Sequence, residues 1–448
     1  MALLHEYYVP GMNVKDYSST VPLDWSMNVP GQSVQGETLQ IFYRVLCAPE
    51  HVHDDLPLLV FLQGGPGGMG PRPLNPSSDG WIAQALQHFR IVLPDQRGTG
   101  RSSCVQASNI GDRGDAKNQA SYLKKFLADS IIRDFEHIRL TDFHGKRWVS
   151  LGQSYGGFLT LTYLSLFPQA LIASFVTGGI AHVPADAQEV YEHTFPRMKA
   201  KSLEFYHRYP QDVKRIAKLV QLVRDGHVVL PNGEVMSVER IQTLGSGFGM
   251  KPGFERVHWM LDTVFAGGDG EVSNVTDVSD EGKASMMNMT TTSALYWPLQ
   301  ELIYANGELD KPIDWAANRV YNSMPEFSVD CEPLLFTGEA IFPWMFEQEK
   351  ALQPFAGAMD VLMNDTHFGV IYDEAQLLRN EVPLQATVYV DDMYVDSTLQ
   401  LDTLSRVGNS HYWATNEFEH DGVHGSKVFN HMFQEALQRG DLEELFTK

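Results

Sequence analysis

A serine flanked by glycines is the strongest chemical signal in this sequence. Ser154 stands within Gly152–Gly157, after a short apolar segment typical of a strand and before one typical of a helix. Glycines on both sides permit a tight strand-to-helix turn that leaves the hydroxyl exposed at the helix N-terminus, where backbone N–H groups can stabilise an anion. The pattern Gly-x-Ser-x-Gly alone arises by chance in long chains, but with these flanking segments it predicts a serine nucleophile.

A serine hydroxyl is a poor nucleophile until a histidine takes its proton, and the histidine needs a carboxylate that fixes its tautomer. On a turn of this kind the acid and the histidine follow the serine in chain order. Asp392 comes directly after a late apolar strand, and His420 lies before the last helix with room between them for one helix and one strand. We predict Asp392 as the acid and His420 as the base, with Asp391 and His424 as alternatives.

Acyl transfer also needs two backbone N–H groups that stabilise the oxyanion. One comes from the residue after the nucleophile, here Tyr155, and the other from a loop that follows an early strand. The glycine-rich loop Gln63–Gly68 is in the right place and offers Gly64 or Gly65. A phosphate-binding loop would require a following Lys-Ser/Thr pair, which is absent. The sequence therefore predicts an oxyanion hole formed by these two segments.

The segments that must position these residues alternate between strands and helices. Apolar runs predict strands at 56–62, 89–93, 171–176, 384–390 and 409–415. One stripe of apolar side chains predicts an amphipathic helix over 119–139, and residues 6–48 are typical of β-hairpins. We expect an α/β fold, a mostly parallel sheet with right-handed crossovers and helices on both faces.

This alternation is lost in the middle of the chain. Helical stretches such as 187–209 and 211–225 alternate there with glycine-rich loops at 245–253 and 267–270. Since 448 residues exceed what one core usually fills, a large insertion is expected. We predict two parts of one core, 1–182 and 381–448, with a mainly helical lid inserted at 183–380.

The composition limits the classes of molecule that this protein is expected to bind. A net charge of −22 argues against nucleic acid and against an anionic membrane surface, and it favours amine-bearing ligands. No apolar run approaches the length that spans a bilayer, and the first residues lack the pattern of a secretory signal. Three widely spaced cysteines predict no disulfide framework, so we expect a cytoplasmic protein. No feature predicts an oligomeric state.

Metal chemistry has little support in the sequence. His51 and His53 form a His-x-His pair in a polar loop, but such a pair without further ligands is more often solvated surface. The metalloprotease pattern HExxH is absent. We predict neither a metal nor a cofactor.

Three strings in order make the chain resemble a known family. Gly64–Gly68 reads GGPGG, Asp95–Ser102 reads DQRGTGRS and Gly152–Gly157 reads GQSYGG. With them the chain resembles the proline iminopeptidases (prolyl aminopeptidases) of the α/β-hydrolase superfamily, in their longer bacterial and fungal type. It departs from them at Gln63, where the family usually has His, and around His420, where the compact members have a Gly-His-Ser-type string.

The resemblance implies a serine exopeptidase that releases an N-terminal proline from peptides through an acyl-enzyme. It also implies that lid carboxylates hold the free amine of the substrate, and a buried cation does need an anionic partner. Glu301 and Glu339 are the candidates for this role. The residues proposed to line an apolar proline pocket are Tyr304, Phe342 and Trp344, and those expected to be structural are Arg97 and Arg101.

The substrate remains open because this superfamily hosts many reactions. An esterase or amidase, or an aminopeptidase of other specificity, would use the same serine, histidine and aspartate. Acidic lid residues beside the serine would favour the peptidase, whereas an apolar lid would favour the esterase. A binding protein without activity would require a broken triad, which nothing in the sequence suggests.

Overall fold

The structure is a computed structural model that describes residues 2–266, 274–290 and 293–446. Its centre is a nine-stranded sheet in the order β1-β2-β3-β5-β4-β6-β7-β8-β9. The strands are β1 (Ala2–Val9), β2 (Met12–Pro22), β3 (Thr38–Cys47), β4 (Leu58–Leu62), β5 (Arg90–Pro94), β6 (Trp148–Gln153), β7 (Leu171–Thr177), β8 (Leu384–Tyr389) and β9 (Ser410–Thr415).

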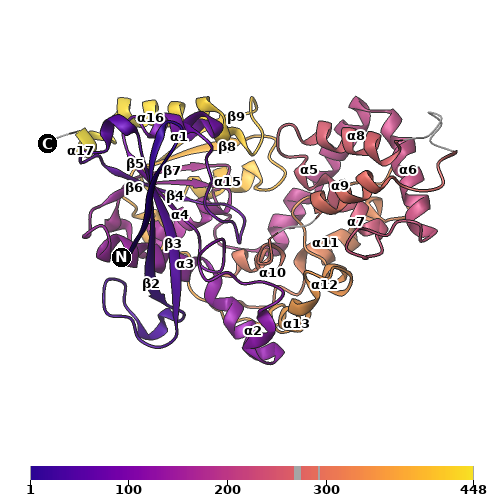
Figure 1. Ribbon diagram of the computed structural model, residues 1–448, viewed down its shortest axis with the longest axis horizontal. Helices are drawn as coiled ribbons and strands as arrows, with labels where there is room; N and C mark the ends of the chain where they lie inside the picture. Colours follow the sequence, from indigo (N-terminus) through magenta and orange to yellow (C-terminus); the bar gives the residue numbers. More distant parts are fainter. Residues whose placement is uncertain (1, 267–273, 291–292, 447–448) are drawn as a thin grey trace.

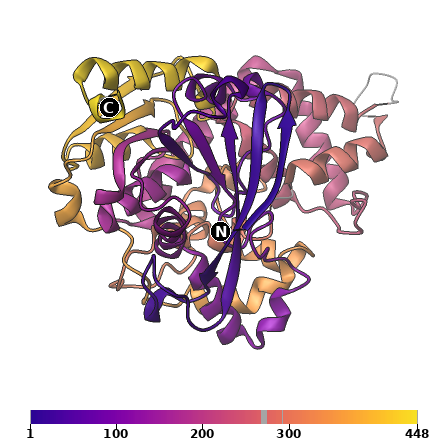
Figure 2. The same cartoon turned by 60° about the vertical axis from the view of Figure 1, so that its left-hand side comes forward.

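The sheet is antiparallel at one edge and parallel elsewhere. Strands β1, β2 and β3 pair in antiparallel register, and β3 also runs antiparallel to β5, whereas the pairs from β5 to β9 are parallel. In Figure 2 the long strands β2 and β3 come to the front of the view. Because β4 to β8 are parallel, their carboxyl ends meet at one edge, where α/β folds place their ligand sites.

Helices cover both faces of this sheet. Helices α1 (Gly80–Ala85) and α16 (Ser426–Arg439) pack on one face, and α3 (Ala128–Thr141) and α4 (Tyr155–Leu166) pack on the other (Figure 1). Buried strands such as β4 and β6 are apolar on both faces for this reason. The other helices of this part are α2 (Ala116–Leu123), α14 (Glu374–Leu378), α15 (Ser397–Leu404) and α17 (Glu443–Phe446).

A helical segment lies between β7 and β8, and we call residues 187–362 the cap. Figure 1 shows it gathered at one end of the molecule, beside the part that contains the sheet. Its helices are α5 (Ala187–Arg208), α6 (Gln211–Arg224), α7 (Val238–Gln242), α8 (Gly253–Val264), α9 (Asp280–Thr290), α10 (Tyr296–Leu299), α11 (Ala316–Ser323), α12 (Pro343–Gln348) and α13 (Ala356–Leu362). The domain limits at 183 and 380 remain a prediction.

The expectation of one helix over 119–139 is wrong. Helix α2 ends at Leu123, a 3₁₀ turn covers Lys124–Phe126, and Leu127 is extended before α3 begins. The carbonyl of Lys125 accepts a hydrogen bond from the Arg97 guanidinium at 2.6 Å instead of from the next helical turn. The break also lets α2 pack against α13 of the cap while α3 stays beneath the sheet.

In the three described ranges, no helix is both long and apolar enough to cross a membrane.

Candidate active site

Ser154 occupies the turn between β6 and α4. Its backbone is strained, with φ 57° and ψ −127°, a conformation that residues other than glycine rarely adopt. The two flanking glycines allow the turn, because a Cβ on Gly156 would lie 1.8 Å from the Leu62 carbonyl oxygen and one on Gly152 would lie 2.3 Å from the Gly156 oxygen. The geometry is that of a nucleophile elbow.

His420 and Asp392 form a buried pair after β9 and β8. The His420 Nδ1 and Asp392 Oδ2 atoms are 2.7 Å apart, and the two residues are 4% and 0% exposed. Backbone N–H groups of Tyr394 and Val395 donate to the other carboxylate oxygen at 2.8 and 3.1 Å, which keeps the Asp392 carboxylate oriented. This is the arrangement that fixes one tautomer of a catalytic histidine.

The pKa of His420 is raised above its usual 6.5. Burial opposes protonation of the imidazole, but the charge of Asp392 and its hydrogen bond outweigh that effect. Glu339 and Asp421 add smaller contributions of the same sign. A protonated His420 is therefore better stabilised than in water, as a base that accepts a proton from serine requires.

The turn formed by Gly178 and Gly179, directly after β7, lies between Ser154 and His420. A Cβ on Gly178 would lie 3.1 Å from the His420 Nδ1 atom, and a Cβ on the adjacent Gly179 would lie 2.2 Å from the Ser154 carbonyl oxygen. The two residues therefore lie on either side of the same two-glycine turn.

The alternatives Asp391 and His424 are placed elsewhere. The Asp391 side chain is exposed and makes no hydrogen bond within the described part of the chain. The His424 Nδ1 atom lies 3.1 Å from Asp79 Oδ1, which precedes α1, and this hydrogen bond raises the pKa of His424. The structure brings neither residue into the Asp392–His420 pair.

The predicted oxyanion loop lies against the nucleophile. A Cβ on Gly64 would lie 3.1 Å from the Ser154 Cβ atom, and Gly65 has φ 123°, which only glycine adopts readily. As the first residue of α4, Tyr155 has an N–H group with no acceptor inside its own helix. Backbone donors from both segments thus flank Ser154.

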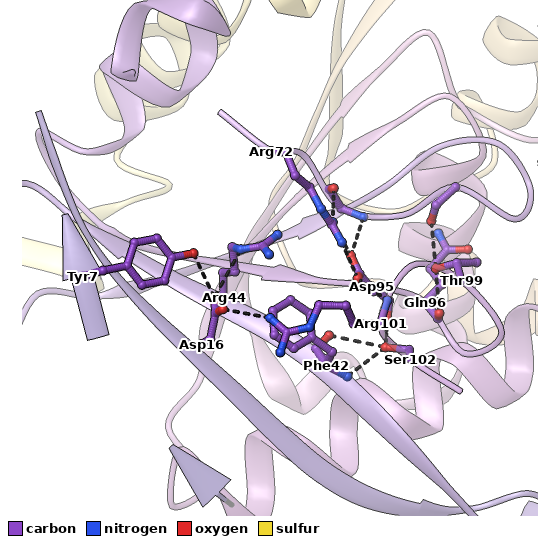
Figure 3. Close-up of polar contacts among 12 residues, drawn as sticks. Tyr7, Asp16, Phe42, Arg44, Arg72, Asp95, Gln96, Thr99, Arg101 and Ser102 are labelled. Atoms are coloured by element: carbon purple, nitrogen blue, oxygen red, sulfur yellow. Dashed lines mark hydrogen bonds and ion pairs between the residues drawn. The ribbon is translucent and has the colours of Figure 1, made fainter. Parts of the chain in front are cut away.

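The DQRGTGRS segment supports this loop (Figure 3). The Gln96 Nε2 atom donates to the Gln63 carbonyl at 2.7 Å, and the Asp95 carboxylate accepts a hydrogen bond from the Gly70 N–H at 3.0 Å. Arg72 pairs with the same carboxylate. The loop that contains Gly64 and Gly65 is held at both ends by neighbouring side chains.

The other end of this segment is tied to the antiparallel strands. The Arg101 Nη1 atom lies 2.9 Å from Asp16 Oδ2, and its guanidinium stacks on Phe42 at 4.0 Å from the ring centroid (Figure 3). Arg97 forms a buried ion pair with Asp134 of α3, with Nε and Oδ2 2.7 Å apart. These contacts give both arginines structural partners in β2, β3 and α3.

The Glu301 side chain forms hydrogen bonds within the cap. It is 0% exposed, and its two carboxylate oxygens accept hydrogen bonds from the N–H groups of Ala316 and Ala317 at 3.0 and 2.8 Å. These are the first residues of α11, so the side chain caps that helix. Burial raises the pKa of Glu301 to about 8, although the two hydrogen bonds lower it.

Glu339 interacts electrostatically with the Asp392–His420 pair. Its carboxylate accepts a hydrogen bond from the Tyr296 hydroxyl. Burial raises the pKa of Glu339, the hydrogen bond from Tyr296 opposes that shift, and the charges of His420 and Asp392 also act on it. Of the two predicted amine-binding residues, Glu339 is the one whose charge acts on His420 and Asp392.

Buried tyrosines beside this site have no signal in the sequence. The hydroxyls of Tyr155, Tyr191 and Tyr372 have no hydrogen-bond partner among the described residues. Tyr304 packs 6.0 Å from Phe158 of α4, measured between ring centroids. These tyrosines come from distant parts of the chain, so no local spacing could predict their meeting.

Two of the three residues predicted to form the proline pocket line a cavity within the cap. Phe342 and Trp344 line a cavity of about 330 Å³ together with Tyr321 and Glu239. Phe342 packs against Tyr321 with ring centroids 5.3 Å apart. Of the three aromatic residues proposed for a proline pocket, Tyr304 is the one that contacts the helix after the nucleophile.

No group of three or more potential metal ligands exists among the residues that the structure describes. The His51 Nδ1 atom instead lies 2.7 Å from Asp54 Oδ2 in the polar surface loop.

The sequence of this chain is similar to those of known hydrolases and peptidases. Residues 57–222 match a family model described as the alpha/beta hydrolase fold. A proline iminopeptidase from Aeromonas sobria is 38% identical over 96% of this chain and 97% of its own length, and one from Aspergillus aculeatus is 32% identical over 89% and 90%. A solved structure, the proline iminopeptidase of Mycobacterium smegmatis, is 10% identical with a TM-score of 0.41 and covers 98% of this chain and 100% of its own. Because the first two relatives match over nearly their whole length, the chain belongs to the proline iminopeptidase family of α/β hydrolases.

Proposed function

We propose that this protein is a serine aminopeptidase that releases an N-terminal proline from peptides. The observation that carries the proposal is the hydrogen-bonded pair of Asp392 and His420 beside the elbow serine, with the Glu339 carboxylate near enough for its charge to act on the imidazole. The names of the two full-length relatives support the same substrate.

In this proposal Ser154 attacks the carbonyl carbon of the first residue. His420 takes the serine proton and then gives it to the leaving amine, while Asp392 holds the imidazole and stabilises its charged form. Water then hydrolyses the acyl-enzyme, with His420 again as the base.

The oxyanion of each tetrahedral intermediate would lie between the N–H of Tyr155 and an N–H of Gly64 or Gly65. Loss of one such donor typically costs about 3 kcal/mol of transition-state stabilisation. The hydrogen bond from Gln96 to Gln63 helps to keep that loop in place.

We assign binding of the substrate amine to Glu339 and a structural role to Glu301. A cationic amine near the serine would be buried, and a buried cation needs an anionic partner. The Glu339 carboxylate accepts a hydrogen bond from Tyr296, whereas both oxygens of Glu301 already bind α11. An esterase would need no anion here, so this carboxylate favours the peptidase.

The test compares three substrates: a proline arylamide, its N-acetylated form and a short-chain aryl ester. We expect turnover of the free-amine substrate alone, and its loss in Ser154→Ala with unchanged thermal unfolding. Preference for the acetylated amide or the ester would refute the amine-binding role and favour the esterase.

The cytoplasmic location remains a prediction, in keeping with three cysteines that are all free.

A further inference from the structure

The loop that contains His420 is held by the cap as well as by the core. Lys201 of α5 points its ammonium at Glu419, the residue before the histidine, with Nζ and Oε1 2.7 Å apart. Both side chains are largely buried, at 8% and 18% exposure. An ion pair of this burial fixes its partners more strongly than a surface pair does.

A second cap segment, residues 246–251, contacts the same loop. The carbonyl of Gly249 accepts a hydrogen bond from the His420 N–H at 2.9 Å. The Tyr394 hydroxyl accepts from the Gly249 N–H at 3.1 Å and donates to the Ser246 carbonyl at 2.6 Å. Its ring lies 4.8 Å from the His420 ring, between centroids, so this tyrosine joins the cap segment to the imidazole.

The residue after the histidine is held in the same way. The Lys251 N–H donates to the Asp421 carboxylate at 3.2 Å, and its ammonium donates to the Glu417 carbonyl at 3.2 Å. Cap atoms therefore bind the chain before, at and after His420.

We propose that Lys201 is a positioning residue for His420: its ammonium fixes Glu419 and thereby sets the place of the adjacent imidazole between Asp392 and Ser154. The inference rests on the proposed catalytic role of His420. It assigns the cap a task in catalysis that is distinct from binding the substrate amine.

The pair is sensitive to the loss of one partner. The Glu419 Oε2 atom is buried and has no hydrogen-bond partner in the described part of the chain, so the carboxylate depends on Lys201. Lys251 and Asp392 are the other charged groups that act on it, with opposite signs. Without the Lys201 ammonium, the carboxylate must leave its site or take up a proton, and either change moves the loop.

A small displacement of His420, the catalytic base, should strongly reduce turnover. A misplacement of 1 Å at a reacting group can reduce turnover by about a hundredfold. Substrate binding would change less, because Lys201 contacts Glu419 and not the site of the amine. Lys201→Met should therefore lower kcat by about tenfold or more while KM stays within about twofold.

Lys199→Met is the matched control. Lys199 lies two residues away on α5 and pairs with Glu326, which is also in the cap, with Nζ and Oε1 2.9 Å apart. Both partners are about one third or more exposed, so this change should leave kcat unchanged. Lys201→Arg, which keeps the charge, should restore part of the lost turnover.

A double-mutant cycle decides whether Lys201 acts through Glu419. We expect Lys201→Met, Glu419→Gln and the double variant to lose similar turnover, because all three remove the same pair. Additive losses, or a kcat for Lys201→Met equal to that of Lys199→Met, would overturn the inference. If Lys201→Met does not fold, the kcat-against-KM split of Glu419→Gln decides alone.

The same assay separates this inference from the proposed function. If the wild type does not cleave proline arylamide, or His420→Ala retains turnover, the proposed function fails. If His420→Ala is inactive while the Lys201 and Glu419 variants behave as wild type, only the positioning role of Lys201 fails.

Discussion

Two adjacent aspartates follow β8, and the fold places their side chains in opposite environments. Asp392 is fully buried against His420, whereas Asp391 is exposed. The chain turns at residues 390–391, so two neighbouring side chains can face different surroundings, one the core and the other solvent. The choice between them depends on where the strand ends, which sequence alone places only to within a residue or two.

These neighbours provide a matched pair of variants. Asp392→Asn should lower kcat by about 10⁴, because an amide favours the wrong tautomer of His420. Asp391→Asn should behave as wild type. Steady-state kinetics with a proline arylamide measures both, and equal losses in the two variants would contradict the assignment.

The raised pKa of His420 determines the acid limb of the pH profile. The base must be neutral to accept the serine proton, so kcat/KM falls as pH drops through its pKa. Since Asp392 raises that pKa above 6.5, we expect the wild-type limb to lie above 6.5. Glu339→Gln should keep this limb but move it slightly to lower pH, because the Glu339 charge adds a smaller contribution to the raised pKa of His420. A limb that disappears in this variant would make Glu339 its source.

The two glutamates of the cap should respond differently to the same substitution. Glu339→Gln should cost about 2 kcal/mol in kcat/KM for the free-amine substrate, about thirtyfold, because the amine loses its anionic partner. Glu301→Gln should instead destabilise the fold by about 1 kcal/mol through its weaker cap on α11. Kinetics and chemical denaturation of both variants separate the roles; a change in KM with Glu301→Gln alone would reverse them.

The sequence could predict residues whose role follows from local spacing. Ser154 stands in a pattern that only a tight turn explains, and the order of acid and base follows from the fold. Glu301 instead caps a helix that begins 15 residues later in the sequence, so local spacing does not indicate that role. Tyr191 lies against Tyr304, with ring centroids 6.2 Å apart, through packing between distant elements, which no local pattern encodes.

At the scale of elements, the DQRGTGRS segment joins three parts of the core. Its Arg97 bonds the Asp134 carboxylate of α3 and the carbonyls of Pro22, Leu23 and Lys125. The bond to Lys125 coincides with the break between α2 and α3. Apolar periodicity continues through this break, so the sequence predicted one helix where the structure has two.

Removal of the Arg97 charge should therefore destabilise the fold. Arg97→Met leaves the Asp134 carboxylate buried without its partner, and we expect a loss of about 3–5 kcal/mol in the free energy of unfolding. Arg113→Met removes an exposed pair with Glu37 and should cost less than about 1 kcal/mol. Denaturant unfolding of both variants measures the difference, and equal costs would contradict a structural role for Arg97.

At the scale of the whole molecule, the site joins segments from both ends of the chain to the cap. The nucleophile and oxyanion loop precede the cap in sequence, and Asp392 and His420 follow it. Parallel strands bring these segments to one edge of the sheet, which is why the order of strands in the sequence points to Ser154, Asp392 and His420 together. The contacts of Lys201 and Gly249 with the His420 loop cross between cap and core, and periodicity within either part does not predict them.

The net charge of −22 should act on the substrate before any contact forms. A peptide with a cationic terminus is attracted by the field of the whole protein, and salt screens that field over about 10 Å at 0.1 M. We expect kcat/KM for a proline arylamide to fall as ionic strength rises, with kcat nearly constant. Glu339→Gln should keep most of this slope, since it removes one of 56 acidic residues. A slope that vanishes in this variant would instead place the salt-sensitive attraction at Glu339 itself.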